Sequence, residues 1–192
     1  MEFRVLGPVE VLDDGLRLDI GGRKQRTVLA LLVANFGRPT SADKLIEGTY
    51  GEDAPDGARH SVQTYISNLR SQLGDLIYSA GHSYQLRRDG STADFIEFGR
   101  LVEGARARLA EDCWTAAAEL RTALEMWRGF PFEDIDARGE LDIEIARLNE
   151  LRMVALETRI EADLSCGRHL ELVGELEALT ASTPFERVST LN

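Results

Sequence analysis

The spacing of apolar residues changes near residue 21, from a period of about two to a period of about 3.6. The first pattern predicts three short strands within residues 2–20, with a hairpin turn at residues 13–15. Gly21 and Gly22 end this sheet, and apolar residues at helical spacing then predict a helix over residues 23–36. The chain therefore begins with a small sheet that is followed by a helix.

Two more helices and a second hairpin complete the first part of the chain. One helix is predicted over residues 42–49, with Thr40 or Ser41 as its N-cap. Another, with Asp56 as its N-cap, runs to about residue 73. Two apolar stretches joined by residues 81–83 then predict a β-hairpin. This order of elements is that of an OmpR-type winged helix, in which the third helix enters the major groove.

Helical spacing dominates from Asp94 onward. The apolar stripes predict helices over residues 94–109, 113–127, 140–166 and 169–181. Helix hairpins with alanine and aromatic residues at their contacts resemble tetratricopeptide repeats, although no clean period of 34 residues is present. We therefore expect an α+β winged-helix domain at residues 1–92 and an all-α, tetratricopeptide-like domain at residues 93–192.

The composition is that of a folded soluble protein, and its charge is unevenly distributed. The 192 residues include 22 Lys+Arg against 33 Asp+Glu, a net charge of −11, and 43% are hydrophobic. No apolar run is long enough to span a bilayer and no signal segment is present, so we expect a cytoplasmic protein. Residues 1–98 carry 11 basic and 14 acidic side chains, and the remainder 11 and 19, so only the first part suits a polyanion.

The third predicted helix has a polar face without acidic residues. Residues 57–74 contain no Asp or Glu, although these make up 33 of the 192 residues. At 100° per residue, polar side chains lie opposite and beside the apolar stripe. The candidate DNA contacts are Arg59, His60, Gln63, Thr64, Ser67, Asn68, Arg70 and Ser71. Such side chains hydrogen-bond base edges and phosphates, and the alternative is a solvated helix face.

Two other basic clusters are candidate phosphate contacts. One is in the second hairpin, with His82, Arg87 and Arg88. The other is at the start of the first helix, with Arg23, Lys24 and Arg26. Adjacent arginines can also be solvated residues at the end of a strand, and basic residues are common where the chain leaves a sheet. Phosphate contact and a solvated surface position therefore both stay open for these residues.

Several stretches of this sequence follow a known family pattern. They are residues 3–10, 22–32 and 62–70, and later residues 117–129 and 175–179 with Pro184. On these residues the chain resembles the SARP (antibiotic regulatory protein) family of bacterial transcriptional activators. The resemblance implies an OmpR-type DNA-binding domain, a helical bacterial transcriptional activation domain, direct-repeat sites in double-stranded promoter DNA, and contact with RNA polymerase. It also implies that an acidic loop faces polymerase rather than DNA, with Tyr50, Glu52, Asp53 and Asp56.

The sequence departs from the family pattern at three places. Two residues are inserted between Gly81 and Tyr84 of the hairpin, and Tyr50 stands where the family commonly ends its second helix with tryptophan. The sequence also ends at Asn192, where the family continues with more helix pairs. Either this is a truncated product, or the protein completes its helical layer with a partner. An open end of a helical stack exposes apolar surface, so we expect a homodimer or another protein partner there.

No constellation of catalytic residues is recognisable. The segment at residues 21–24 lacks the spacing of a phosphate loop, the three histidines belong to no triad, and Cys166 with His169 lacks a second ligand pair for zinc. We therefore expect no enzyme, no metal and no cofactor. The two cysteines predict no disulfide framework. Cys113 is expected in the core, and Trp114 and Trp127 are expected in core or hairpin packing.

Two classes of function remain. The first is a sequence-specific DNA-binding transcriptional regulator that activates transcription. The second is a protein-interaction module that binds another regulator without appreciable affinity for DNA, as the net charge of −11 favours.

Overall fold

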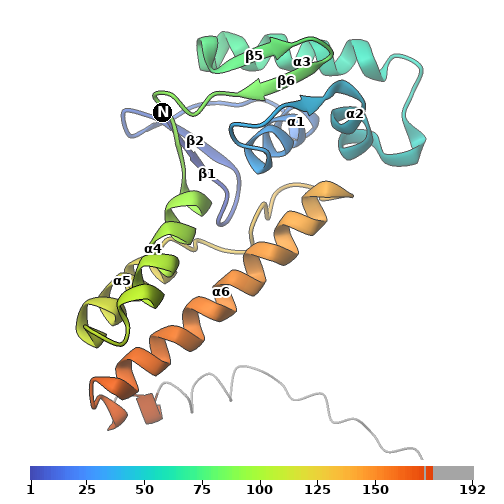
Figure 1. The fold of residues 1–192 in the computed structure, drawn as a ribbon. Helices are drawn as coiled ribbons and strands as arrows, with labels where there is room; N and C mark the ends of the chain where they lie inside the picture. Colours follow the sequence, from blue (N-terminus) through green and yellow to red (C-terminus); the bar gives the residue numbers. More distant parts are fainter. Residues whose placement is uncertain (171, 175–192) are drawn as a thin grey trace, which may run out of the picture.

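The computed structural model describes residues 1–170 and 172–174, in a sheet-containing N-terminal region and a helical C-terminal region (Figure 1). The strands are β1 (Glu2–Arg4), β2 (Glu10–Asp13), β3 (Leu16–Arg17), β4 (Thr40–Ser41), β5 (Ile77–Ala80), β6 (Ser83–Leu86) and β7 (Thr92–Ala93). The helices are α1 (Arg23–Ala34), α2 (Ala42–Tyr50), α3 (Ala58–Leu73), α4 (Asp94–Arg108), α5 (Cys113–Glu125) and α6 (Glu140–Ser165), with 3-10 turns η1 (Gly51–Asp53) and η2 (Gly74–Leu76). Most of the helix predicted over residues 169–181 lies outside the described residues.

Two small sheets frame the N-terminal region. The first has the strand order β3-β2-β1-β7, and the second has the order β4-β6-β5. In the first sheet β1 runs antiparallel to β2 but parallel to β7, with Phe3 opposite Ala93. Since β7 leads directly into α4, the first sheet is also the place where the helical region is attached.

Helix α1 forms the centre of the N-terminal core. All seven residues from Thr27 to Val33 are buried, which is more than one amphipathic stripe provides. The reason is that α1 contacts α2 and α3 and also α6 of the helical region. The predicted helix is therefore confirmed, and its apolar residues face neighbours on several sides.

Of the two predicted N-caps for α2 and α3, one is confirmed and one is wrong. For α2, the predicted cap at Ser41 is confirmed, because its Oγ accepts a hydrogen bond of 3.2 Å from the backbone N–H of Lys44. For α3, the predicted cap at Asp56 is wrong. The backbone N–H of Ala58 donates to the carbonyl of Pro55 at 2.8 Å and closes a turn, so the N-cap position falls to Gly57.

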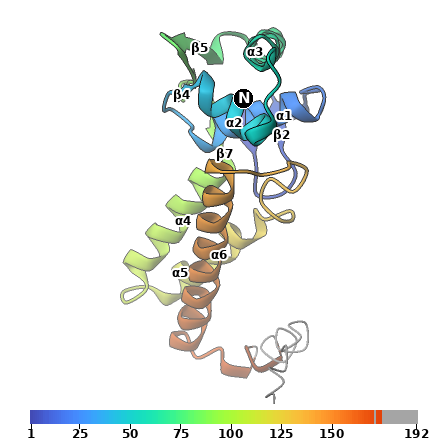
Figure 2. The same cartoon turned by 90° about the vertical axis from the view of Figure 1, so that its right-hand side faces the viewer.

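In the helical region, α5 packs between α4 and α6 (Figures 1 and 2). Trp127 is buried and makes an edge-to-face contact with Phe98, with ring centroids 5.3 Å apart. Trp127 thus lies in the core, which is one of its two predicted positions, whereas Trp114 does not, since 60% of its surface is exposed. Within the described residues, no helix combines the length and apolarity that crossing a membrane requires.

The prediction that the cysteines form no disulfide is also wrong. Cys113 at the start of α5 and Cys166 just after α6 are joined by a disulfide, with their Cα atoms 5.8 Å apart. The pairing could not be predicted from the sequence because 53 positions separate the two cysteines. The two residues meet only because α5 and α6 pack together along their lengths.

Replacing both Cys113 and Cys166 by serine should lower the free energy of unfolding by about 2–4 kcal/mol relative to the oxidised parent. A cross-link that closes a loop of this length restricts the unfolded chain, and its loss restores that freedom. The measurement is chemical denaturation of the oxidised parent, the reduced parent and the double variant. The reduced parent should match the double variant, and equal stability of all three would show that the disulfide contributes nothing.

Candidate nucleic-acid interface

Helix α3 and the β5–β6 hairpin lie together at the end of the molecule remote from the far ends of α4, α5 and α6 (Figures 1 and 2). The stripe of α3 that packs on α1 and α2 consists of Ala58, Val62, Ile66, Leu69 and Leu73. The opposite side is open to solvent, and its exposed polar residues are His60, Gln63, Thr64, Ser67, Asn68 and Ser71. The fold therefore gathers the predicted polar residues on one exposed face, which we call the α3 face.

Some donors and acceptors of the α3 face are not used by hydrogen bonds among the described residues. Thr64 donates its hydroxyl to the His60 carbonyl at 3.0 Å, and Ser71 donates to the Asn68 carbonyl at 2.6 Å. Both hydroxyl oxygens still have lone pairs with which to accept. Among the described residues, no partner hydrogen-bonds to the exposed side chains of Gln63 and Ser67. These two side chains can bind a ligand without giving up a bond within the chain.

Gln25 is a contributor that the sequence interpretation missed. Its Nε2 donates to the Ile20 carbonyl at 3.0 Å, and its Oε1 accepts from Nδ2 of Asn68 at 3.2 Å. The start of α1 is thus joined to the middle of α3, and the hydrogen bond with Gln25 orients the Asn68 side-chain amide. The available signal was the position of Gln25 between two basic residues of the first helix.

The two arginines of α3 differ in how they are held. Arg59 forms an ion pair with Asp43 at 2.5 Å, but both side chains are more than half exposed, so a phosphate can compete for the guanidinium. Arg70 is half-buried and donates to the Ile77 carbonyl and to Ser79 Oγ, both at 2.9 Å. The structure therefore places Arg70 between α3 and the hairpin, where it holds β5 against the helix.

The hairpin residues also separate into two groups. His82 is exposed at the turn, and Arg87 is exposed with its guanidinium 4.9 Å from the centre of the Tyr78 ring. Arg88 instead donates from Nε and Nη2 to the Phe36 carbonyl, at 3.3 and 3.1 Å. The structure thus leaves His82 and Arg87 on the hairpin and ties Arg88 to the end of α1.

The basic residues at the start of α1 lie beside the acidic loop. Arg23 and Lys24 are exposed, and the Lys24 ammonium lies 3.9 Å from the centre of the Tyr50 ring. The Tyr50 hydroxyl is 3.5 Å from that of Tyr65 on α3. Arg26 is bound elsewhere, because it pairs with Asp134 and donates to the Val9 carbonyl at 2.6 Å.

The acidic residues of the loop between α2 and α3 point away from the core. Glu52, Asp53 and Asp56 are all exposed, while Tyr50 at the end of α2 is half-buried. Their carboxylates would repel a phosphate backbone. The loop is therefore poorly suited to lie against the DNA backbone. Its contact with another protein, which the family resemblance implies, stays a prediction.

A buried carboxylate, which the sequence interpretation also missed, joins the start of α4 to the loop after β1. Asp94 at the start of α4 accepts hydrogen bonds from the backbone N–H groups of Val5, Leu6 and Phe95, at 2.8–3.0 Å. Burial raises the pKa of the Asp94 carboxyl above its ordinary value, and these bonds with the charge of Arg128 act in the opposite direction. No periodicity marks such a residue, because its partners come from another part of the chain.

The loop between α5 and α6 adds to this attachment. Its backbone donates from Arg128 to the Leu6 carbonyl at 2.7 Å and from Phe132 to the Val5 carbonyl at 3.0 Å. The helical region is therefore bonded to the strand region by main-chain hydrogen bonds as well as by side chains. No cluster of His, Cys, Asp or Glu suited to a metal ion occurs in the part of the chain that the structure describes.

Two family models match this chain. Residues 20–85 match the model described as "Transcriptional regulatory protein, C terminal", and residues 93–189 match "Bacterial transcriptional activator domain". The first match includes α3 and the hairpin up to Gln85, and the second begins one residue before α4.

Characterised relatives resemble the chain over nearly all of its length. Regulatory protein DnrI of Streptomyces peucetius is 34% identical, over 96% of this chain and 73% of its own length. Transcriptional regulatory protein EmbR of Mycobacterium tuberculosis is 34% identical over 96% of this chain, and regulatory protein AfsR of Streptomyces coelicolor is 37% identical over all of it. The chain spans half the length of EmbR and 20% of AfsR.

A solved structure of a relative has the same fold. The structure of Mycobacterium tuberculosis EmbR in complex with a low-affinity phosphopeptide superposes with a TM-score of 0.86 at 34% identity. The alignment covers 96% of this chain and 51% of that chain.

Proposed function

Since the chain belongs to the SARP family of bacterial transcriptional regulators, with an OmpR-type DNA-binding domain and a bacterial transcriptional activator domain, we propose that it binds promoter DNA sequence-specifically and activates transcription. Residues 1–92 act as a winged helix that reads the DNA. Residues 93–192 form a tetratricopeptide-like domain that contacts other proteins. The protein works in the cytoplasm.

The observation that carries this proposal is the α3 face. It is exposed, free of acidic residues over residues 57–74, and flanked by a hairpin with His82 and Arg87 at its surface. The polar side chains of α3 read base edges in the major groove, and the hairpin touches the neighbouring backbone. The proposed DNA contacts are Arg23, Lys24, Arg59, His60, Gln63, Thr64, Ser67, Asn68, Arg70, Ser71, His82, Arg87 and Arg88. Arg70 and Arg88 would contribute with the donors that their internal bonds leave free.

The proposed contact with RNA polymerase is the acidic loop at Tyr50, Glu52, Asp53 and Asp56. This proposal is supported by the exposed carboxylates of Glu52, Asp53 and Asp56 and by the position of the loop directly before α3. Two copies of the chain would occupy a direct repeat, so we also propose a dimer or tandem pair on DNA. The exposed apolar residues of the helical region, such as Trp114, offer surface for a homodimer or a protein partner.

The test is selection of bound fragments from the source organism's genomic DNA with purified chain at moderate salt. A recovered motif that is repeated at about one helical turn would support a DNA reader that acts in pairs. Folded protein that recovers nothing above background would contradict the proposal and favour the protein-interaction module.

The affinity for a recovered fragment should fall about a hundredfold between 50 and 200 mM salt. This is the loss expected for about four phosphate contacts, each of which releases a condensed counterion. The measurement is fluorescence anisotropy of a labelled fragment over a salt series. A salt-independent affinity would mean that Arg59, Arg87 and the α1 start do not contact the phosphates.

A further inference from the structure

Gln25 and Asn68 form a chain of hydrogen bonds whose direction is set by the backbone. A carbonyl only accepts, so the Ile20 carbonyl requires the Gln25 amide to approach with Nε2, which donates to it at 3.0 Å. Oε1 of Gln25 is then the end that faces α3, and it also only accepts. Asn68 therefore has to approach with Nδ2, which donates to it at 3.2 Å. A backbone carbonyl thus determines which end of an exposed amide is left free.

The Gln25 side chain is held by the glycine turn that precedes α1. Gln25 is half-buried in the first turn of this helix. Its amide lies across the backbone of Gly21, where an added Cβ atom would come 2.7 Å from Nε2 and 3.0 Å from Cδ. A larger residue at position 21 would therefore displace the amide from the Ile20 carbonyl. The glycine and the carbonyl together fix the end of Gln25 that is remote from α3.

The bond to Gln25 leaves Asn68 with one donor and one acceptor. An asparagine amide has two N–H donors and one oxygen. Gln25 takes one of the donors, and among the described residues no group donates to Oδ1 of Asn68. The side chain is exposed on the α3 face. A ligand there meets one N–H beside one oxygen.

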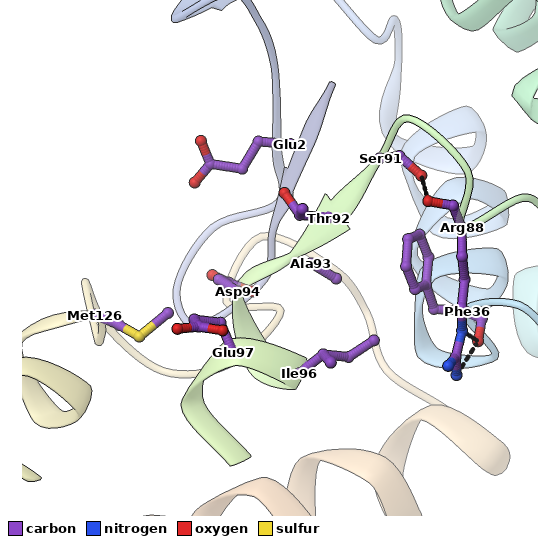
Figure 3. Close-up of a pocket in the computed structure, with 10 residues that line it drawn as sticks. All are labelled: Glu2, Phe36, Arg88, Ser91, Thr92, Ala93, Asp94, Ile96, Glu97 and Met126. Atoms are coloured by element: carbon purple, nitrogen blue, oxygen red, sulfur yellow. Dashed lines mark hydrogen bonds between the residues drawn. The ribbon is translucent and has the colours of Figure 1, made fainter. Parts of the chain in front are cut away.

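The arginines near the α3 face are held in a way that leaves only donors. In Figure 3 the Arg88 guanidinium reaches the Phe36 carbonyl, to which it donates from Nε and Nη2. Arg70 donates in the same manner to the Ile77 carbonyl. A guanidinium has no acceptor, so its remaining groups suit phosphates or the two acceptors of guanine. Asn68 differs from both arginines because its free edge has groups of both kinds.

Adenine is the base whose major-groove edge is complementary to such an amide. It presents the N7 acceptor beside the N6 amino donor, whereas guanine presents two acceptors, N7 and O6. Cytosine presents a donor without a neighbouring acceptor, and thymine presents an acceptor beside a methyl group. A phosphate oxygen only accepts and would repel Oδ1. The donor and acceptor count therefore selects one base of the four.

We propose that Asn68 reads an adenine in the major groove and that Gln25 is the positioning residue that gives Asn68 this specificity. Nδ2 of Asn68 donates to N7 of the base, and Oδ1 accepts from the N6 amino group. Gln25 itself does not touch the base. This inference rests on the proposed function, because it assigns one base to one side chain of the α3 face.

The test uses the full chain and the fragment recovered from genomic DNA. Each adenine of the motif is replaced in turn by 7-deazaadenine, which pairs with thymine but lacks the N7 acceptor. In the parent, one adenine in each copy of the repeat should show an affinity loss of at least about fivefold, as expected for half of a bidentate contact. Asn68→Ala should abolish the loss at that adenine alone. A recovered motif without such an adenine would overturn this inference and leave the proposed function intact.

Gln25→Met separates positioning from packing, because methionine has a similar length but no N–H donor. The loss on 7-deazaadenine substitution at the Asn68-dependent adenine should fall below about twofold, while the losses at other adenines stay as in the parent. Gln72→Met makes the same change at an exposed position near the end of α3 and should keep the parent profile. A parent-like profile in Gln25→Met would overturn the positioning role.

The hydrogen bond between Gln25 and Asn68 can also be followed without DNA. In the NMR spectrum of the free chain, Gln25→Met should shift the Nδ2 proton signals of Asn68, because it removes their acceptor, and Gln72→Met should not. Unchanged Asn68 signals in Gln25→Met would overturn the inference. Folded chain that recovers no DNA would instead contradict the proposed function, and the reading of adenine with it, whatever the Asn68 signals show.

Discussion

Replacing Ser67 by glutamate is expected to lower the affinity for a recovered promoter fragment at least about a hundredfold and to leave the melting temperature unchanged. Ser67 is exposed at the centre of the α3 face and has no side-chain partner among the described residues, so its loss breaks no internal bond. A carboxylate there would face the acceptor edges and phosphates of DNA in a helix that otherwise has no acidic residue. A hundredfold loss corresponds to about 2.7 kcal/mol of binding free energy.

The matched control is Ser165→Glu at the last residue of α6. Ser165 is also exposed, and the change alters the net charge by the same amount far from α3. Fluorescence anisotropy at fixed salt measures both variants, and thermal unfolding checks their folds. Parent-like binding by Ser67→Glu would move the DNA-reading surface off α3. An equal loss in Ser165→Glu would show that the effect is net charge alone.

The parts of the fold that follow from local spacing could be predicted from the sequence. The stripe of Val62, Ile66 and Leu69 is buried as its period requires, and the opposite polar residues are therefore exposed. The order of strands, helices and hairpin follows from turn residues and apolar runs for the same reason. Each of these features depends on residues that are close together in the sequence.

The interaction partners of individual charged and sulfur-containing side chains could not be predicted from the sequence. Arg70 and Arg88 look equivalent as basic residues near a reading helix, yet each is bound to a backbone carbonyl of another element. Cys113 meets Cys166 only through the packing of two helices. Such pairings depend on which distant segments meet, and neither periodicity nor composition carries that information.

Of the contacts between distant segments that the sequence does not predict, those of Asp94 contribute most to stability. Asp94→Ala is expected to lower the free energy of unfolding by about 4–6 kcal/mol, because it removes the acceptor of three N–H groups, each worth about 1–3 kcal/mol when left unpaired in the interior. It also removes the carboxylate 3.6 Å from the Arg128 guanidinium. Against a typical total of about 5–15 kcal/mol, this loss would bring the chain close to unfolding at moderate temperature.

Two further variants make the Asp94 result interpretable by urea denaturation followed by circular dichroism. Asp94→Asn should lose roughly half as much, because the amide oxygen still accepts but the amide NH₂ confronts a backbone donor. Asp89→Ala, at an exposed residue of the same connector, should change stability by less than about 0.5 kcal/mol. A loss below about 1 kcal/mol in Asp94→Ala would mean that water or a shifted backbone satisfies these donors. The attachment of the two regions would then rest on the pairing of β1 with β7 and on the α5–α6 loop, whose N–H groups donate to the Val5 and Leu6 carbonyls.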